Sequence, residues 1–180
     1  MGQRARWIRI GIAEPRELLA TLAGFALAQP VHAAPIVAWG RATAPVDSEL
    51  LRADAGCFVF ALIAPRRLAP GRAARWPAWV LAPALAACRA LGLRAWADGA
   101  ELRLAGVPLA RAAAAALGAC ALASASLESR LPGAEFEERT IESLVRSRLE
   151  AQHGWEFDHS WPNAAERAAI ARAQPQSLAA

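Results

Sequence analysis

The chain of 180 residues contains no lysine and no tyrosine, so all 20 of its basic residues are arginine. A chain without lysine cannot form a Schiff base, cannot carry a P-loop lysine and cannot hold phosphate with a lysine ammonium. The formal net charge of +4 would indicate nucleic-acid binding only if the basic residues gathered on one surface with stacking aromatic side chains. Here the arginines stand singly, apart from the pair Arg66 and Arg67. We therefore expect no nucleic-acid partner.

Long apolar runs and closely spaced cysteines are also missing. No run of about 18 strongly apolar residues is present, so no membrane-spanning segment and no membrane partner are expected. Cys57, Cys88 and Cys120 form no CxxC pair, which excludes a zinc ribbon or a thioredoxin-type site. Their apolar neighbours indicate buried thiols in a reducing compartment. His153 and His159 do not share a helix face, so we expect no metal site.

Alanine is abundant instead, at 48 of 180 residues, within a hydrophobic share of 56%. The charged residues make up 20% of the chain and are spread along it, which is typical of a folded chain and not of a disordered one. This length is enough to bury a core without disulfides or metals. We expect one domain over residues 1–175 and a disordered tail over 176–180.

The N-terminal segment permits two interpretations. Arginines followed by an apolar stretch and an A-x-A-like pattern near Ala33 outline a secretory leader over residues 1–33. Against the leader, Glu14 and Glu17 interrupt the arginine-rich part, residues 7–12 alternate like a strand, and Pro15 opens a helix well. The strand and helix account for every residue, so we expect an unprocessed, cytoplasmic protein. The leader would instead make the protein secreted or periplasmic.

Downstream, hydrophobic periodicity and turn residues predict an ordered set of elements. They are a strand over 36–40, an irregular connection over 41–55, a strand over 57–64, a helix over 76–91 interrupted or restarted at Pro83, a hairpin over 93–104 with its turn at Asp98 and Gly99, a helix over 138–152 that Gly154 ends, a half-buried strand around Trp155 and Phe157, and a helix from the capping box at Asn163 to about Ala173. Residues 111–127 are either a helix, because of five consecutive alanines, or two strands around Gly118. The order predicts a mixed α/β chain of the α+β type, with a largely antiparallel sheet flanked by helices.

This order resembles the catalytic domain of the biotin/lipoate protein ligases, the family that includes lipoate–protein ligases and octanoyltransferases. Residues 7–11 with 35–39 resemble the family's opening strands, 57–68 its central strand and exit loop, 90–110 its lysine-bearing hairpin, and 118–131 with the Asn163 helix its closing elements. The resemblance covers nearly the whole chain, and it implies a biotin/lipoate ligase-like fold.

The family's diagnostic residues are where the sequence departs. The resemblance implies an Arg-Arg-x-x-Gly-Gly-Gly loop that closes over the acyl chain and the nucleotide phosphates, but residues 41–54 contain no glycine and three acids. Backbone N–H groups cradle phosphate where glycine allows close approach. The family's lysine position falls on or beside Pro108. Within the matching stretch, Gly106 and Arg111 are the candidate ligand-binding residues, although a guanidinium does not replace a compact ammonium.

These departures favour a non-catalytic ligase-like domain that binds a lipoyl-carrier protein or pairs with a ligase subunit. It would need no cofactor, and a lipoyl or octanoyl group is the expected ligand. The alternative is a cysteine-dependent octanoyl or lipoyl acyltransferase, since some relatives use a thiolate. No catalytic residue stands out, but Cys120 is the first candidate, because the hairpin that carries it could bring it near Arg111. If the protein is an enzyme, we expect the lipoyl/octanoyl transferase or lipoate–protein ligase class.

Overall fold

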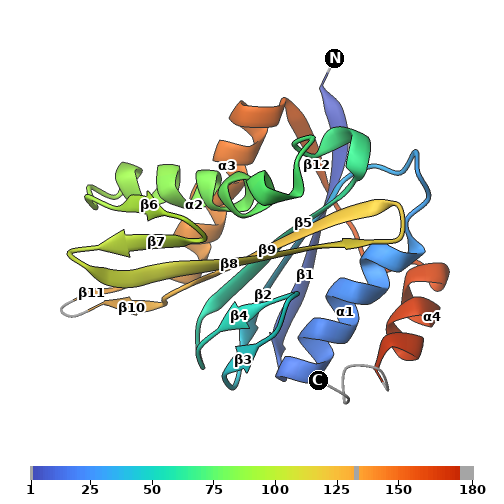
Figure 1. The fold of residues 1–180 in the computed structure, drawn as a ribbon, viewed down its shortest axis with the longest axis horizontal. Helices are drawn as coiled ribbons and strands as arrows, with labels where there is room; N and C mark the ends of the chain where they lie inside the picture. Colours follow the sequence, from blue (N-terminus) through green and yellow to red (C-terminus); the bar gives the residue numbers. More distant parts are fainter. Residues whose placement is uncertain (1, 132–133, 175–180) are drawn as a thin grey trace.

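Eight strands of the described chain, residues 2–131 and 134–174 of the computed structural model, form one mixed sheet (Figure 1). Their order across the sheet is β12 (Trp155–His159), β1 (Gln3–Ala13), β2 (Ile36–Ala42), β5 (Phe58–Pro65), β9 (Cys120–Leu127), β8 (Val107–Leu117), β7 (Glu101–Leu104) and β6 (Trp96–Asp98). β1 runs parallel to both of its neighbours, and the other neighbouring pairs are antiparallel. The mixed, largely antiparallel sheet flanked by helices is therefore confirmed. The tail predicted at 176–180 lies outside the described residues.

Helices cover both faces of the sheet. α2 (Trp76–Ala90) and α3 (Glu138–His153) pack on one face, and α1 (Pro15–Ala28) packs on the other through Leu18, Leu22 and Phe25. α4 (Ala164–Ala173) lies against α1 (Figure 1). The shorter elements are the hairpin of β3 (Val46–Asp47) and β4 (Arg52–Ala53), the pair β10 (Arg130–Leu131) and β11 (Ala134–Glu135), and the 3-10 turns η1 (Arg66–Leu68) and η2 (Ala73–Arg75).

The strand and helix predicted for residues 7–28 are both present, as β1 and α1. Trp7 and Ile8 are buried on opposite faces of β1, so the strand contributes to both cores. In the described part of the chain, no helix combines the length and the apolarity that crossing a membrane requires.

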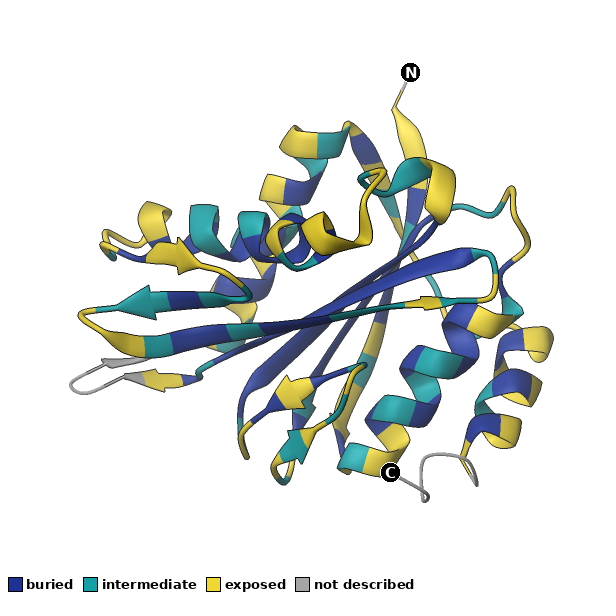
Figure 2. Ribbon diagram, in the orientation of Figure 1, coloured by how far each residue is buried: buried dark blue, intermediate teal, exposed yellow. Residues whose placement is uncertain are grey.

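The ambiguous stretch 111–127 is two strands, not a helix. β8 and β9 pair around Gly118, whose φ of 54° suits glycine in a tight turn. β9 lies between β5 and β8, and all of its residues are buried (Figure 2). Because β9 is hydrogen-bonded to a strand on each side, pairing within the sheet overrides the helix propensity of the alanines in β8.

Three local predictions were wrong. α2 does not break at Pro83. A proline in a helix interior costs about 3 kcal/mol, but Trp79 and Val80 are buried in the same helix. Each buried side chain contributes roughly 1.5–3 kcal/mol, which offsets that cost. The first strand of the 93–104 hairpin begins only at Trp96. The connection 41–55 is not wholly irregular, because it contains the β3–β4 hairpin.

The ends of the last two helices follow the sequence signals. Gly154 ends α3 in the left-handed conformation, with a φ of 63°. Asn163 and Glu166 form the capping box that begins α4, each accepting a backbone N–H of the other. These two ends fix the short connection that carries β12 between α3 and α4.

Candidate functional site

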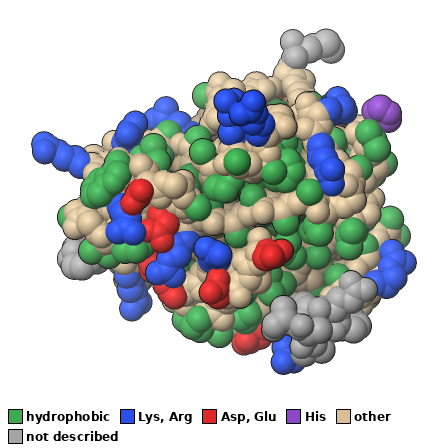
Figure 3. Space-filling view, viewed as in Figure 1, with side chains coloured by type: hydrophobic (Ala, Val, Ile, Leu, Met, Phe, Trp, Pro, Cys, Tyr) green, Lys and Arg blue, Asp and Glu red, His purple; other side chains and the backbone are tan. Residues whose placement is uncertain are grey.

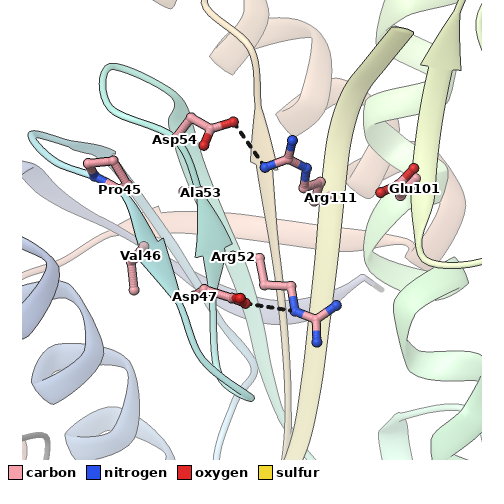
Figure 4. A pocket seen from close by; sticks show the side chains of 8 residues that line it. All are labelled: Pro45, Val46, Asp47, Arg52, Ala53, Asp54, Glu101 and Arg111. Carbon is pink, nitrogen blue, oxygen red and sulfur yellow. Dashed lines mark hydrogen bonds and ion pairs between the residues drawn. The ribbon is translucent and has the colours of Figure 1, made fainter. Parts of the chain in front are cut away.

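A cavity of about 630 Å³ lies between the β3–β4 hairpin and strands β7 and β8 (Figure 4). Its lining residues are Pro45, Val46, Asp47, Arg52, Ala53, Asp54, Glu101 and Arg111. The hairpin supplies the first six, and the sheet supplies the last two. The cavity therefore lies where residues 41–54, the segment that the ligase resemblance singles out, face β8, the strand on which the family's lysine position falls.

The charged groups of this cavity are largely paired with one another. Arg111 Nη1 lies 2.9 Å from Asp54 Oδ2, and Arg52 Nε lies 3.2 Å from Asp47 Oδ1. Glu101 stands opposite Arg111 across β7 and β8, and its carboxylate accepts a bond from Arg103. Figure 3 shows acidic and basic side chains gathered side by side on one part of this face. Three carboxylates and two guanidiniums line the cavity, and each guanidinium already has an aspartate partner.

The inner side of the hairpin segment is part of the core. Leu51 and Ala53 are buried in the same cluster as the α1 residues Leu18 and Phe25. The Ser124 hydroxyl on β9 donates to the Leu50 carbonyl at 2.5 Å. This segment is thus packed on the sheet beside α1, and the open cavity is left only toward its charged outer side.

Of the two predicted ligand-binding residues, only Arg111 lines the cavity. Gly106 lies at the tip of the β7–β8 hairpin, five residues before Arg111. Five residues of extended strand span about 16 Å. Gly106 has a φ of 84° and follows Ala105, whose φ is 50°, so two successive residues of this turn are left-handed. Glycine therefore serves the turn here, and the structure does not bring Gly106 and Arg111 together.

The expectation that Cys120 approaches Arg111 was wrong. Cys120 pairs with Leu117 at one end of the β8–β9 hairpin, whereas Arg111 pairs with Ser126 six residues further along β9. Six residues of strand span about 20 Å. The register of the hairpin, fixed by the turn at Gly118, therefore separates the two side chains.

The cysteines lie in apolar surroundings. Cys57, Cys88 and Cys120 are each buried. Burial raises the pKa of the Cys57 thiol to about 12, with a further contribution from Glu128, and raises that of Cys88 to about 11. Burial also raises the pKa of Cys120, although nearby Arg66 acts in the opposite direction. A thiol with a raised pKa is a poor nucleophile near neutral pH.

The sequence reasoning missed a buried carboxylate, Glu142 on α3, which is 5% exposed. It accepts from Trp7 Nε1 at 2.8 Å, from Arg9 Nε at 2.8 Å and from Arg9 Nη2 at 2.6 Å. Glu142 raises the pKa of Arg9 through this hydrogen bond and through its charge. A signal was available: Glu142 stands between Ile141 and Val145 on the apolar face of the helix.

The two histidines near β12 lie in separate surroundings. His153 stacks on Trp155 with ring centroids 4.5 Å apart and accepts from Trp79 Nε1, whereas His159 contacts Arg146. Among the described residues, no three His, Cys, Asp or Glu side chains gather where they could hold a metal ion.

The sheet order and the helices on its two faces give the chain the fold of the biotin/lipoate protein ligase catalytic domain. Comparison with solved structures supports this fold assignment. A lipoate–protein ligase A bound with ATP matches with a TM-score of 0.80 and 10% sequence identity, over 96% of this chain and 95% of that one.

Two further structures illustrate the likeness. One chain from the structure of a bipartite lipoate protein ligase and its lipoyl domain from Thermoplasma acidophilum matches with a TM-score of 0.79 at 10% identity, over 97% of this chain and 93% of that one. The biotin acetyl coenzyme A carboxylase synthetase from Helicobacter pylori matches with a TM-score of 0.60 at 11% identity, over 82% and 75%. At these identities the likeness concerns the fold. No protein-family model matches the sequence, and no curated protein matches it either.

Proposed function

We propose that this chain is a ligase-like domain that does not catalyse ligation, and that it binds an acyl- or lipoyl-carrying partner or acts as a subunit of a lipoylation system. One observation carries the proposal. The segment that forms the glycine-rich loop in the family is here a hairpin whose Leu51 and Ala53 are packed into the core. A segment held in this way does not offer the flexible backbone N–H groups that cradle phosphate.

The charges of the cavity support the same conclusion. Asp47, Asp54 and Glu101 line it, and like charge close to a polyphosphate disfavours its binding. A phosphate would also have to displace Asp54 from Arg111 and Asp47 from Arg52. On the resemblance, the position of the family's lysine falls on or beside Pro108 in β8, which carries no charge.

The cysteine-dependent acyltransferase is less well supported. Its first candidate, Cys120, is 0% exposed and lies about 20 Å along the strand from the cavity. An acyl donor would have to reach a thiol that the core covers and that burial keeps protonated.

The fold supports the choice of partner. One of the similar structures is that of a bipartite lipoate protein ligase and its lipoyl domain from Thermoplasma acidophilum. For this chain, we propose an acylated carrier domain as the partner, because a ligase fold without adenylation activity could still bind such a domain. The cavity beside Arg111 is where we place the acyl group.

Two measurements test the proposal. The first incubates the protein with a lipoyl domain, octanoyl-coenzyme A or lipoate plus ATP and magnesium, and follows the mass of both proteins. We expect no acyl group on either protein. The second measures binding of the lipoyl domain in its apo, octanoylated and lipoylated forms, with tighter binding of the acylated forms expected.

Arg111→Glu serves as the test variant, and it should weaken binding of the acylated forms at least several-fold. Arg89→Glu, on α2 at the other face of the sheet, is the matched control and should leave binding unchanged. Transfer of an acyl group to either protein would refute the non-catalytic role. Equal binding of the apo, octanoylated and lipoylated lipoyl domain, or no binding of any of them, would refute the proposal that an acylated carrier domain is the partner.

A further inference from the structure

A second cavity, of about 270 Å³, lies on the sheet face that α2 and α3 cover. Its lining residues are Trp7 and Arg9 from β1, and His159, Ser160 and Trp161 from the end of β12 and the connection to α4. Trp7 belongs to the core on that face, whereas the β3–β4 hairpin packs with α1 on the other face. The two cavities are therefore separated by the sheet.

Three of the residues that line this cavity, Arg9, Ser160 and Trp161, each have a hydrogen-bond donor without a partner among the described residues. Arg9 binds Glu142 through Nε and Nη2, and its Nη1 has no partner in the described part of the chain. Ser160 Oγ accepts from Arg6 Nε at 2.9 Å, so its own proton is available to donate. The indole N–H of Trp161 has no partner among the described residues, and this side chain is 83% exposed.

His159 adds a fourth donor. Arg146 Nη1 lies 2.6 Å from Nε2 of His159. Because a guanidinium can only donate, Nε2 must accept, and in the neutral ring the proton is on Nδ1. None of the five residues that line this cavity in the described chain is acidic, and the carboxylate of Glu142 is already occupied by Trp7 and Arg9.

Hydrogen bonds hold the backbone of Ser160 and Trp161 in place at the edge of this cavity. Arg6 Nη2 donates to the Trp161 carbonyl at 2.9 Å, and the Ser160 N–H donates to the Trp7 carbonyl at 3.1 Å. Arg6 is itself paired with Glu166 in the first turn of α4. A backbone that is already held in place lowers the cost of binding, because less conformational freedom is lost when the ligand arrives.

We infer that this cavity binds the carboxylate of a small aromatic acid. The donors of Arg9, His159, Ser160 and Trp161 complement the two oxygens of a carboxylate, and the exposed ring of Trp161 offers an aromatic ligand a face to stack on. Tryptophan and arginine are also enriched among the residues that contribute most to binding at protein interfaces. The ligand site is independent of the proposed lipoyl partner.

The test uses benzoate as the probe, with benzamide and cyclohexanecarboxylate as matched comparisons. Benzamide keeps the ring and removes the charge, and cyclohexanecarboxylate keeps the charge and removes the π-system. In two-dimensional NMR spectra of the nitrogen-15-labelled protein, benzoate should shift the Trp161 and Trp7 indole signals with a Kd of about 1 mM or below, in keeping with a ligand of this size. Benzamide should bind at least ten-fold more weakly, and cyclohexanecarboxylate several-fold more weakly.

Variants then locate the site. Trp161→Ala should reduce benzoate affinity at least ten-fold, followed through the Trp7 indole signal, and Ser160→Ala should reduce it several-fold. Trp96→Ala, which removes another exposed tryptophan at the far edge of the sheet, should leave it unchanged. The inference is overturned if benzoate produces no saturable shift, if benzamide binds as well as benzoate, or if Trp161→Ala and Trp96→Ala behave alike.

Discussion

At the scale of single residues, the buried carboxylate of Glu142 is a group that requires hydrogen-bond partners inside the protein. A carboxylate that is 5% exposed would be costly if it were left without partners. Here three donor atoms on Trp7 and Arg9 satisfy both of its oxygens, and one of those side chains carries the opposite charge. The group therefore ties α3 to β1, and it also orients Arg9 toward the cavity that contains Trp161.

Replacing Glu142 with glutamine should destabilise the protein by about 1–3 kcal/mol, the usual range for losing hydrogen bonds to a charged group. The amide keeps one acceptor for Trp7 or Arg9 but removes the charge that Arg9 faces. Urea unfolding measures the effect. Glu150→Gln is the control, because Glu150 is 41% exposed beside Arg146, and it should cost about 0.5 kcal/mol or less. Equal losses in the two variants would contradict this assignment.

His153 should make stability depend on pH. Burial lowers its pKa below 6.5 in the folded state, so the unfolded chain binds a proton more readily than the folded one. Its contribution is therefore complete well above pH 6.5 and is lost as the pH falls below that value. Protonation would also remove the acceptor for Trp79 Nε1.

The measurement compares unfolding midpoints at pH 7.5 and pH 5.5 for the wild type and for His153→Phe, which keeps an aromatic ring against Trp155. The wild type should lose more stability on acidification than the variant does. Identical losses would show that His153 is not the group responsible.

At the scale of helices and strands, the sequence predicted the elements with a strong period or a clear end signal. The alternation in residues 7–12, the apolar run at 57–64 and the capping box at Asn163 each correspond to an observed element. The prediction stayed open for 111–127 because alanine favours helix locally, and only the place of β9 between two other strands decides the outcome. Long-range pairing of this kind is not encoded in local propensity.

The candidate sites were less predictable, for the same reason. Arg111 meets Asp54 across 57 positions of sequence, and Arg9 meets Glu142 across 133. Neither pair leaves a spacing pattern that could be recognised. Gly106 and Cys120 share the β8 hairpins with Arg111, but strand length and register keep all three apart.

The contact between α1 and α4 depends on Gly24. A Cβ atom at this position would lie 2.6 Å from the backbone nitrogen of Ile170 and 2.6 Å from its Cγ1. A rotamer change could relieve only the second contact. Gly24 therefore allows the two helices to approach as closely as they do.

Gly24→Ala should lower the free energy of unfolding by about 1–3 kcal/mol, as overpacking does, despite a gain of about 1 kcal/mol in helix propensity. Adding Ile170→Ala should not restore stability, because the backbone contact remains. Gly71→Ala, in a loop with open space around the added Cβ, is the control and should change stability by no more than about 0.5 kcal/mol. Restoration by the second substitution would show that the side chain alone carries the effect.

At the scale of the whole molecule, the fold presents two cavities on opposite faces of one sheet. The first, beside the β3–β4 hairpin, mixes acids with paired arginines. The second, beside Trp161, offers donors without acids. The chain has the sheet and helices of the ligase fold, and we propose that the groups facing its cavities do not support adenylate chemistry.

ATP should therefore not bind measurably. Nucleotide bound at 100 times its Kd would stabilise the folded protein by about 2.7 kcal/mol, which raises the Tm of a chain of this size by roughly 5–10 °C at about 2–4 °C per kcal/mol. With about 1 mM ATP and magnesium, any Kd near 10 μM would give such a shift. We expect no shift, because the hairpin is packed into the core through Leu51 and places Asp47 and Asp54 in the cavity. Titration calorimetry on the same samples is the second measurement. A micromolar Kd for ATP would refute the prediction that the cavity beside the β3–β4 hairpin does not bind a nucleotide.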